Sequence, residues 1–156
     1  MKLSNILFLA LFGLTLSSCG PKVIVEESKV IENGSWTYEN ELKFDFEIID
    51  TSKTYDIWVE MGHDVDFPYQ NFYSNIRTVF PDGEEQIQLL SFEIAENSGR
   101  WFGKCNDENC HIEIPLQVGA RFDQVGDYLI GFEQYSRKDS LWGIEKFSFK
   151  LTESDL

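Results

Sequence analysis

Residues 42–48, LKFDFEI, alternate apolar and charged residues without a break. The apolar residues fall on one face of an extended chain, and the charged residues fall on the other. A period of two is typical of a β-strand with one buried and one solvated face. The stretch therefore predicts a half-buried strand in an antiparallel sheet, since such sheets commonly keep one face in water.

The same period recurs along the rest of the chain, separated by turn residues such as Pro81-Asp82-Gly83. Apolar stripes predict strands at 55–61, 72–80, 86–94, 112–118, 128–134 and 144–151. A long loop is expected at 62–69, and Pro115, which lacks an amide donor, predicts an edge strand or a bulge. No helical stripe exceeds two turns. Seven or eight strands at this spacing predict an all-β, antiparallel β-sandwich of the jelly-roll type.

The N-terminal segment reads as a secretion signal. Lys2 precedes the apolar run ILFLALFGLTL at 6–16, which is shorter than the roughly 20 residues that span a bilayer. Leu16-Ser17-Ser18-Cys19 resembles the lipobox of bacterial lipoproteins, in which the peptide is cut before the cysteine and the cysteine carries lipid. The alternative is an ordinary signal peptide with an incidental cysteine.

These features predict three parts of the chain. Residues 1–18 form a lipoprotein signal peptide, and residues 19–33 form the lipidated Cys19 and a tether that ends in an irregular strand. Residues 34–156 form a single β-sandwich domain, which is an ordinary domain size.

Composition narrows the class of protein. The formal net charge is −14, from 27 acidic and 13 basic side chains, so nucleic acid would be repelled. The 13 Phe, 6 Tyr and 4 Trp supply apolar area for a core and argue against disorder. We expect an acidic, folded body that binds no nucleic acid, and no small-molecule substrate is identified.

Cys105 and Cys110 are the first and last residues of the polar segment CNDENC. Disulfides form in the oxidising compartments outside the cytoplasm, so a local disulfide that closes this loop is expected. A metal site of Cys105, Cys110 and His111 is the alternative, although structural zinc sites usually show two ligand pairs.

Other polar clusters leave further alternatives open. His63, Asp64 and Asp66 could bind a metal, and the segment 106–108 could donate oxygens to calcium, although no EF-hand pattern surrounds it. No G-x-S-x-G elbow or glycine-rich phosphate loop is present. We therefore expect no enzyme, no catalytic residue, no metal and no cofactor apart from the covalent lipid at Cys19.

Aromatic residues beside prolines, glycines and arginines mark several loops. Trp, Tyr and Arg dominate binding hot spots, so these loops predict a binding rim, whereas the alternative is that the rings plug the ends of the core. The candidate partner contacts are Phe67, Tyr69, Asn71, Arg100, Trp101, Arg137 and Trp142.

Several of these stretches occur in an ordered set over nearly the whole chain beyond Cys19. The set consists of Cys19, Trp36, Tyr55, Phe67-Pro68-Tyr69-Gln70-Asn71, Pro81-Asp82-Gly83, Gly99-Arg100-Trp101-Phe102-Gly103, Phe122, Gly126, Tyr128, Gln134, Arg137 and Leu141-Trp142-Gly143-Ile144. In this order the chain resembles the gliding-motility lipoprotein GldH family of Bacteroidota. The chain departs from that pattern at Gly62-His63-Asp64, where the family tends to show an arginine, and at Tyr135-Ser136, where it tends to show a methionine.

The resemblance implies a non-enzymatic envelope component required for gliding. It also implies links to companion gliding lipoproteins and, through them, to the type IX secretion apparatus. We expect a lipid-anchored protein of the outer membrane that faces the periplasm. A lipoprotein that binds envelope glycan or cell wall is the alternative.

Overall fold

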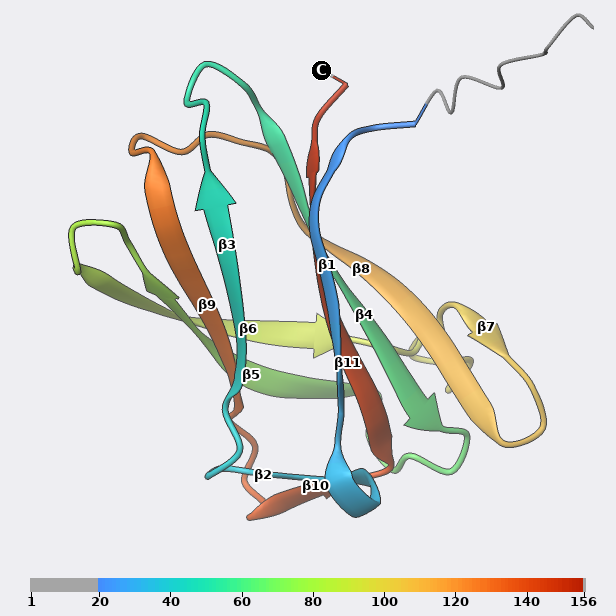
Figure 1. Ribbon diagram of the computed structural model, residues 1–156. Coiled ribbons are helices and arrows are strands. Elements are labelled where there is room, and N and C mark those ends of the chain that lie inside the picture. The colour runs from blue at the N-terminus through green and yellow to red at the C-terminus, as the bar shows by residue number, and fades with distance from the viewer. Residues whose placement is uncertain (1–19, 156) are drawn as a thin grey trace, which may run out of the picture.

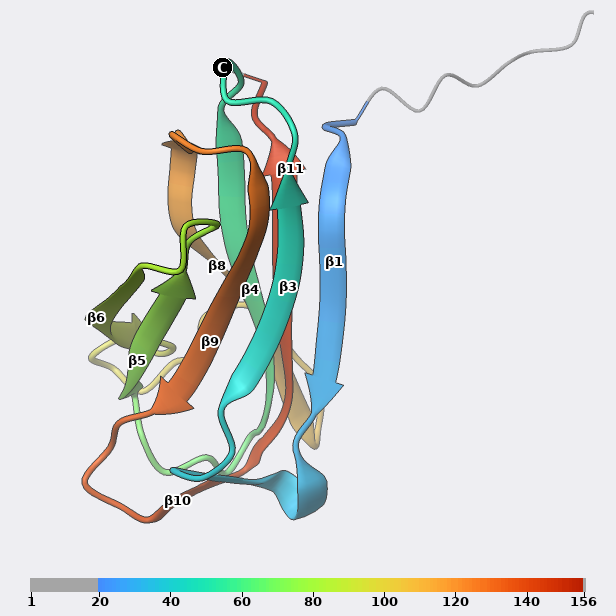
Figure 2. The ribbon, with the colours of Figure 1, turned by 60° about the vertical axis from the view of Figure 1, so that its left-hand side comes forward.

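The computed structural model describes residues 20–155, so Cys19 and the expected signal peptide lie outside the described residues. One sheet has the strand order β1-β11-β4-β8-β7, and its strands are β1 (Val23–Val30), β11 (Ile144–Glu153), β4 (Tyr55–Asp64), β8 (Asn109–Ala120) and β7 (Lys104–Cys105). The other has the order β3-β9-β5-β6, and its strands are β3 (Leu42–Ile48), β9 (Gly126–Gln134), β5 (Asn71–Val79) and β6 (Glu85–Glu93). The two sheets face each other (Figures 1 and 2). The all-β, antiparallel prediction is confirmed.

A smaller ribbon closes one end of the sandwich. The 3-10 turn η1 (Glu32–Gly34) leads into β2 (Ser35–Thr37), which pairs with β10 (Ser140–Trp142). Trp36 of β2 is fully buried and its indole packs on Phe72 and Phe147, so the ribbon covers the end of the core.

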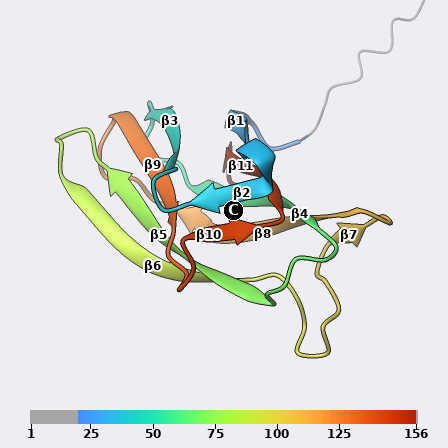
Figure 3. The ribbon, with the colours of Figure 1, turned by 90° about the horizontal axis from the view of Figure 1, so that it is seen from below.

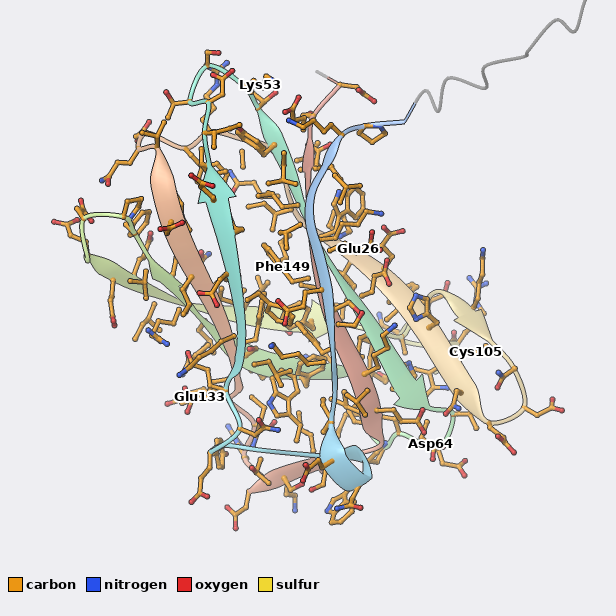
Figure 4. All side chains as sticks on the ribbon, viewed as in Figure 1. Glu26, Lys53, Asp64, Cys105, Glu133 and Phe149 are labelled. Carbon is orange, nitrogen blue, oxygen red and sulfur yellow. A yellow bond between two sulfur atoms is a disulfide. The ribbon has the colours of Figure 1, made fainter. Side chains whose placement is uncertain are left out.

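The strand predicted at 42–48 is β3, and its burial alternates residue by residue as the pattern required. Phe44 points inward and meets Phe147 and Phe149 of β11, with ring centroids 6.4 and 5.6 Å apart. Figure 4 shows Phe149 between the two sheets. The core is therefore a layer of aromatic rings that joins the sheets, as the phenylalanine content suggested.

One expected loop is partly strand. β4 runs on to Asp64 because His63 and Asp64 pair with Cys110 and Asn109 of β8, so the loop predicted to start at residue 62 is shorter. The strand expected within residues 19–33 is β1, which pairs along β11 at the edge of the five-stranded sheet and has a register shift near Val23.

Pro115 lies where its missing amide is tolerated. It belongs to β8, opposite Trp58 of β4, and the register shifts beside it. The two-residue strand β7 pairs only with His111 and Cys110 of β8, so the far side of Pro115 is a free edge among the described strands. Both predictions for Pro115, an edge position and a bulge, are confirmed.

The start of the described chain and the β2–β10 ribbon lie at opposite ends of the sandwich. β1 runs the length of its sheet from the end where residue 20 enters to the end where η1 begins (Figures 1 and 2). Eight extended residues span about 26 Å. Within residues 20–155, no helix has the length and apolar character needed to cross a membrane.

Candidate binding surface

The largest hollow described lies beside the β2–β10 ribbon, at the edge of the outer face of the four-stranded sheet. Its volume is about 640 Å³, which is within the usual range for ligand sites. We call it the tyrosine groove, and it is lined by Tyr38, Tyr69, Asn71, Phe72, Tyr73, Leu89, Tyr135, Ser136, Arg137, Lys138 and Leu141.

Strand alternation and two loops place the tyrosines around this groove. Tyr73 of β5 points outward between the inward-facing Phe72 and Ser74, and it is 45% exposed. The amide of Tyr135, just after β9, donates to the Tyr73 carbonyl at 2.7 Å. The Tyr38 hydroxyl donates to the Ser136 carbonyl, which ties the β2–β3 loop to the β9–β10 loop. Residues far apart in sequence therefore form one surface.

Gln134 shapes the loop that carries the charged part of the groove. Its side chain is fully buried, and its Oε1 accepts from the amide and the hydroxyl of Ser136 at 3.0 and 2.7 Å. Its Nε2 donates to the carbonyls of Lys138 and Asp139 at 3.1 and 3.4 Å. The buried side-chain amide of Gln134 thus forms hydrogen bonds with four polar groups of a tight loop, and these bonds also satisfy its own donor and acceptor atoms.

The groove is positively charged within an acidic protein. Arg137 and Lys138 line it, and no carboxylate does. Across residues 20–155, neither side chain has an ion-pair partner, whereas six other lysines and arginines pair with glutamates. The groove therefore offers two unpaired cations beside exposed aromatic rings, which suits an anionic or polar ligand.

A second hollow of about 580 Å³ lies at the same end of the sandwich, next to η1. Trp142 and Val30 line it and are 63% and 79% exposed, respectively. Asp64, Asp66 and Glu145 also line it, so this hollow is apolar and acidic rather than basic.

Phe67 and Trp101 belong to a packed aromatic cluster with His63. Phe67 is 3% exposed and fills the end of the core, but it also lines the second hollow, so its role as a partner contact stays a prediction. Trp101 is half-buried, lies 4.7 Å from the His63 ring, and donates from Nε1 to the Val65 carbonyl at 3.2 Å. For these two residues the core-plug alternative describes the structure better.

His63 is fully buried, and its Nδ1 lies 2.8 Å from the Asp64 carbonyl. Nδ1–H is therefore the donor, and Nε2 has no hydrogen-bond partner among the described residues. Burial lowers the pKa of His63, and the bond to the Asp64 carbonyl acts in the opposite direction. The ring is neutral at pH 7.

The polar clusters have local roles. A disulfide joins Cys105 and Cys110, so their sulfurs are not free thiolates, and Figure 4 shows Cys105 on the β7–β8 hairpin. Asn106 Oδ1 accepts from the amides of Glu108 and Asn109 at 2.9 and 2.7 Å and so closes the hairpin loop. In the described part of the chain, no three His, Cys, Asp or Glu side chains are grouped closely enough to hold a metal.

The structure brings together only some of the candidate contacts. Tyr69, Asn71 and Arg137 line the tyrosine groove, Trp142 lines the second hollow, and Arg100 lies apart in an exposed ion pair with Glu96. The candidate set omitted several groove residues, namely Tyr38, Tyr73, Leu89, Tyr135 and Lys138. Tyr73 carried a usable signal, because it occupies an outward position of a predicted strand.

The chain is a lipoprotein-family β-sandwich, and this fold by itself does not fix a function, because one architecture hosts many functions. The chain belongs to the GldH lipoprotein family, whose model matches residues 23–151. This is a family of gliding motility lipoproteins of the cell envelope and is not a known enzyme family.

Two relatives are similar over almost their whole length. The gliding motility lipoprotein GldH homolog of Christiangramia forsetii is 25% identical over 156 residues, which cover 95% of each chain. The gliding motility lipoprotein GldH of Flavobacterium johnsoniae is 22% identical over 162 residues, which cover 99% of this chain and 100% of the relative.

One solved structure is also similar, a carbohydrate-binding module of family 28 specific for non-crystalline cellulose. The TM-score is 0.44 at 12% identity, with 84% of this chain and 75% of that chain covered. A likeness of this size carries no argument about the ligand.

Proposed function

We propose that this protein is a non-enzymatic, lipid-anchored subunit of the gliding machinery that assembles or stabilises companion gliding and type IX secretion lipoproteins. Its anchor is the lipid on Cys19, and it needs no other cofactor. We place it in the outer membrane, facing the periplasm. Membership of a gliding motility lipoprotein family supports the role in motility.

One observation carries the assembly role. The chain enters the sandwich at one end, and the β2–β10 ribbon lies at the other (Figure 1). The tyrosine groove and the second hollow are lined by residues of this ribbon and of the loops beside it. A protein anchored just before Gly20 would therefore present both hollows away from the membrane, where another envelope protein can reach them. Exposed Tyr, Trp and Arg side chains there are the residue types that dominate binding hot spots.

The strand order supports the finer description of the fold. The two four-stranded layers have the strand orders β1-β11-β4-β8 and β3-β9-β5-β6. Consecutive long strands either pair within one layer or cross to the other layer. This is the strand order expected of a jelly roll. Loops then gather at the two ends of the sandwich, which is where the hollows lie.

The test is a groove variant produced in a gliding host that lacks its own copy of the gene. Tyr73→Ala/Tyr135→Ala/Arg137→Gln changes exposed groove residues only, and we expect lost colony spreading and lower levels of companion lipoproteins by quantitative mass spectrometry. Val125→Ala, at an exposed residue on the anchor end, is the matched control. Normal spreading and normal companion levels in the triple variant would overturn the proposal.

The anchor requires its own test. Cys19→Ala removes the lipidation site, so we expect the protein to leave the membrane fraction and motility to be lost. A pull-down of the intact lipidated protein from native membranes should recover other gliding lipoproteins, and the variant should not. If both the wild type and the Cys19→Ala variant are recovered without companion lipoproteins, the result favours the second candidate function, glycan binding.

The second candidate is a lipoprotein that binds an envelope glycan. Exposed tyrosine rings in an open groove favour it, because aromatic faces supply apolar contact while hydroxyl and amide groups hydrogen-bond a polar ligand. Affinity electrophoresis in alginate and in neutral dextran would test it. Retardation that is lost in the triple groove variant would support glycan binding, and equal mobility in all gels would exclude these polymers as ligands.

A further inference from the structure

The sandwich leaves four sheet edges among the described strands: β1, β3, β6 and the β7–β8 side. Unpaired backbone amides and carbonyls along an edge invite pairing with a further strand. Folded proteins block such pairing with charged residues, prolines, bulges or very short strands. The four edges of this protein differ in whether they carry these features.

Three edges are protected. β1 carries Glu26, Glu27 and Lys29 and has a register shift near Val23. β3 carries a charged residue at every second position. β8 contains Pro115 and a shift in register, and the short strand β7 covers one of its ends.

The fourth edge, β6, carries none of this protection in its centre. Residues 86–92, QIQLLSF, contain no charged residue, proline or glycine. Ile87 and Leu89 are 64% and 52% exposed on the outer face. Gln86 and Gln88 on the opposite face line an open hollow of about 350 Å³ instead of the core. Uncharged, apolar segments of this length pair readily with other strands.

The position of β6 makes this edge accessible. β6 pairs only with β5, and the β5–β6 hairpin projects beyond the rest of the sandwich, as the view from below shows (Figure 3). Side chains of an added strand would lie over Ile87 and Leu89 on one face and over the glutamines on the other. Leu89 also lines the tyrosine groove, so the edge and the groove are continuous.

We propose that the β6 edge docks an extended segment of a partner protein, which pairs as a fifth strand of this sheet. Glu85 and Glu93 close the two ends of β6, and both stay exposed although Glu85 lies 3.4 Å from Arg77 and Glu93 accepts from Asn71 and Ser91. The charges therefore select a segment with basic residues at its ends and apolar residues between them. The proposal rests on the proposed assembly role and specifies the kind of segment that the companion protein supplies.

Charge disfavours a second copy of this chain as the occupant. Antiparallel pairing of two β6 strands about Leu89 places Glu85 of each copy opposite Glu93 of the other. Like charges directly opposite each other on paired strands are destabilising, and the net charge of −14 adds repulsion.

The test uses the full-length lipidated protein in nanodiscs and a fluorescent probe peptide, Lys-Thr-Val-Thr-Val-Thr-Val-Thr-Lys. Binding is measured by anisotropy, and the contact is located by hydrogen exchange and mass spectrometry. We expect slower exchange within residues 85–93. Leu89→Lys, which places a cation on the edge, should weaken binding about tenfold. Val118→Lys on the protected β8 edge is the matched control, since Val118 is also 52% exposed, and it should change binding less than about twofold.

Peptides with glutamate at both ends, or with a central proline, should bind at least about tenfold more weakly, because they add like charges or remove a ladder hydrogen bond. The proposal is overturned by unchanged exchange in residues 85–93, by equal effects of Leu89→Lys and Val118→Lys, or by full binding of the proline peptide. Dimerisation of the protein alone, with slower exchange in β6, would assign the edge to a second copy and overturn it too. The groove variants test the assembly role separately, so the two proposals can fail independently.

Discussion

The buried amide of Gln134 donates from Nε2 to the backbone carbonyl of Lys138 at 3.1 Å, so a core residue fixes the loop that carries the cations of the tyrosine groove. The same side chain holds Ser136 through Oε1. The shape of the binding surface therefore depends on a residue that no ligand would touch.

We predict that Gln134→Leu, which keeps the size of the side chain, destabilises the protein by about 1–3 kcal/mol, because buried loop groups lose their partners. Urea unfolding monitored by Trp fluorescence measures the change. Gln124→Leu is the control, since loss of the exposed hydrogen bond from Gln124 to Asp82 should lower the free energy of unfolding by less than about 0.5 kcal/mol. Equal stability of the two variants would contradict the role given to Gln134.

The Cys105–Cys110 disulfide should stabilise the hairpin only modestly. It closes a loop with a sequence separation of five, for which chain entropy predicts about 2 kcal/mol. Replacing both cysteines by alanine should lower the free energy of unfolding by about that amount or less. Reductant should destabilise the wild type and leave the double variant unchanged, and an effect of reductant on the variant would point to another cause.

His63 should make the protein less stable at mildly acidic pH. Its folded-state pKa is lowered by burial, so as pH falls below the unfolded pKa of about 6.5 the unfolded chain binds the proton more fully than the folded protein does. Stability is therefore full above that pH and decreases as pH falls, by at most about 1.4 kcal/mol per pH unit.

Urea unfolding at pH 7.5 and 5.5 measures this loss for His63. We expect His63→Phe, which fills the site beside Trp101 with a ring that does not titrate, to show a smaller difference between the two pH values. His111→Gln removes an exposed ring and keeps His63, so it should retain the loss. A pH dependence that is the same in all three proteins would rule out His63 as its source.

Gly131 of β9 leaves room for the Glu41–Arg77 ion pair on the outer face of the four-stranded sheet. Arg77 Nε and Nη2 donate to the two Glu41 oxygens at 2.8 and 3.1 Å, and these hydrogen bonds hold the pKa of Glu41 below its ordinary value. A Cβ on Gly131 would press directly on the Glu41 carboxylate.

We therefore predict that Gly131→Ala displaces the Glu41 carboxylate and destabilises the protein, but has a smaller effect in a Glu41→Ala background. A double-mutant cycle by urea unfolding should give a coupling free energy of about 1 kcal/mol between the two positions. Gly62→Ala is the control, because a Cβ there meets only ordinary contacts. Additive effects of Gly131→Ala and Glu41→Ala would contradict the steric argument.

Much of the fold was readable from local pattern. The alternation at 42–48 became β3 with the predicted buried face, and Pro115 lies at a free edge with a register shift. Both features could be predicted from residues close together in the sequence, because the period of two and the missing amide are properties of a single strand. The length of β4 was not readable, because His63 and Asp64 become strand only through pairing with β8.

The candidate contacts were less predictable. Phe67 and Trp142 are both aromatic residues of predicted loops, yet one is 3% exposed and the other, at the end of β10, is 63% exposed. Composition cannot separate them, because exposure depends on which strands close over a loop. Tyr38, Tyr73 and Tyr135 meet in one groove only because β5 pairs with β9 and the β2–β10 ribbon closes the end of the sandwich.

The sequence by itself determined an acidic, aromatic-rich, all-β chain of the GldH lipoprotein family, since composition, strand period and motif order are properties of the chain alone. Only the tertiary structure decided which strand is left at an unprotected edge and which side chains share a groove. Strand order and register arise from pairing between residues far apart in sequence, and a period of two is the same for an edge strand and for a central one.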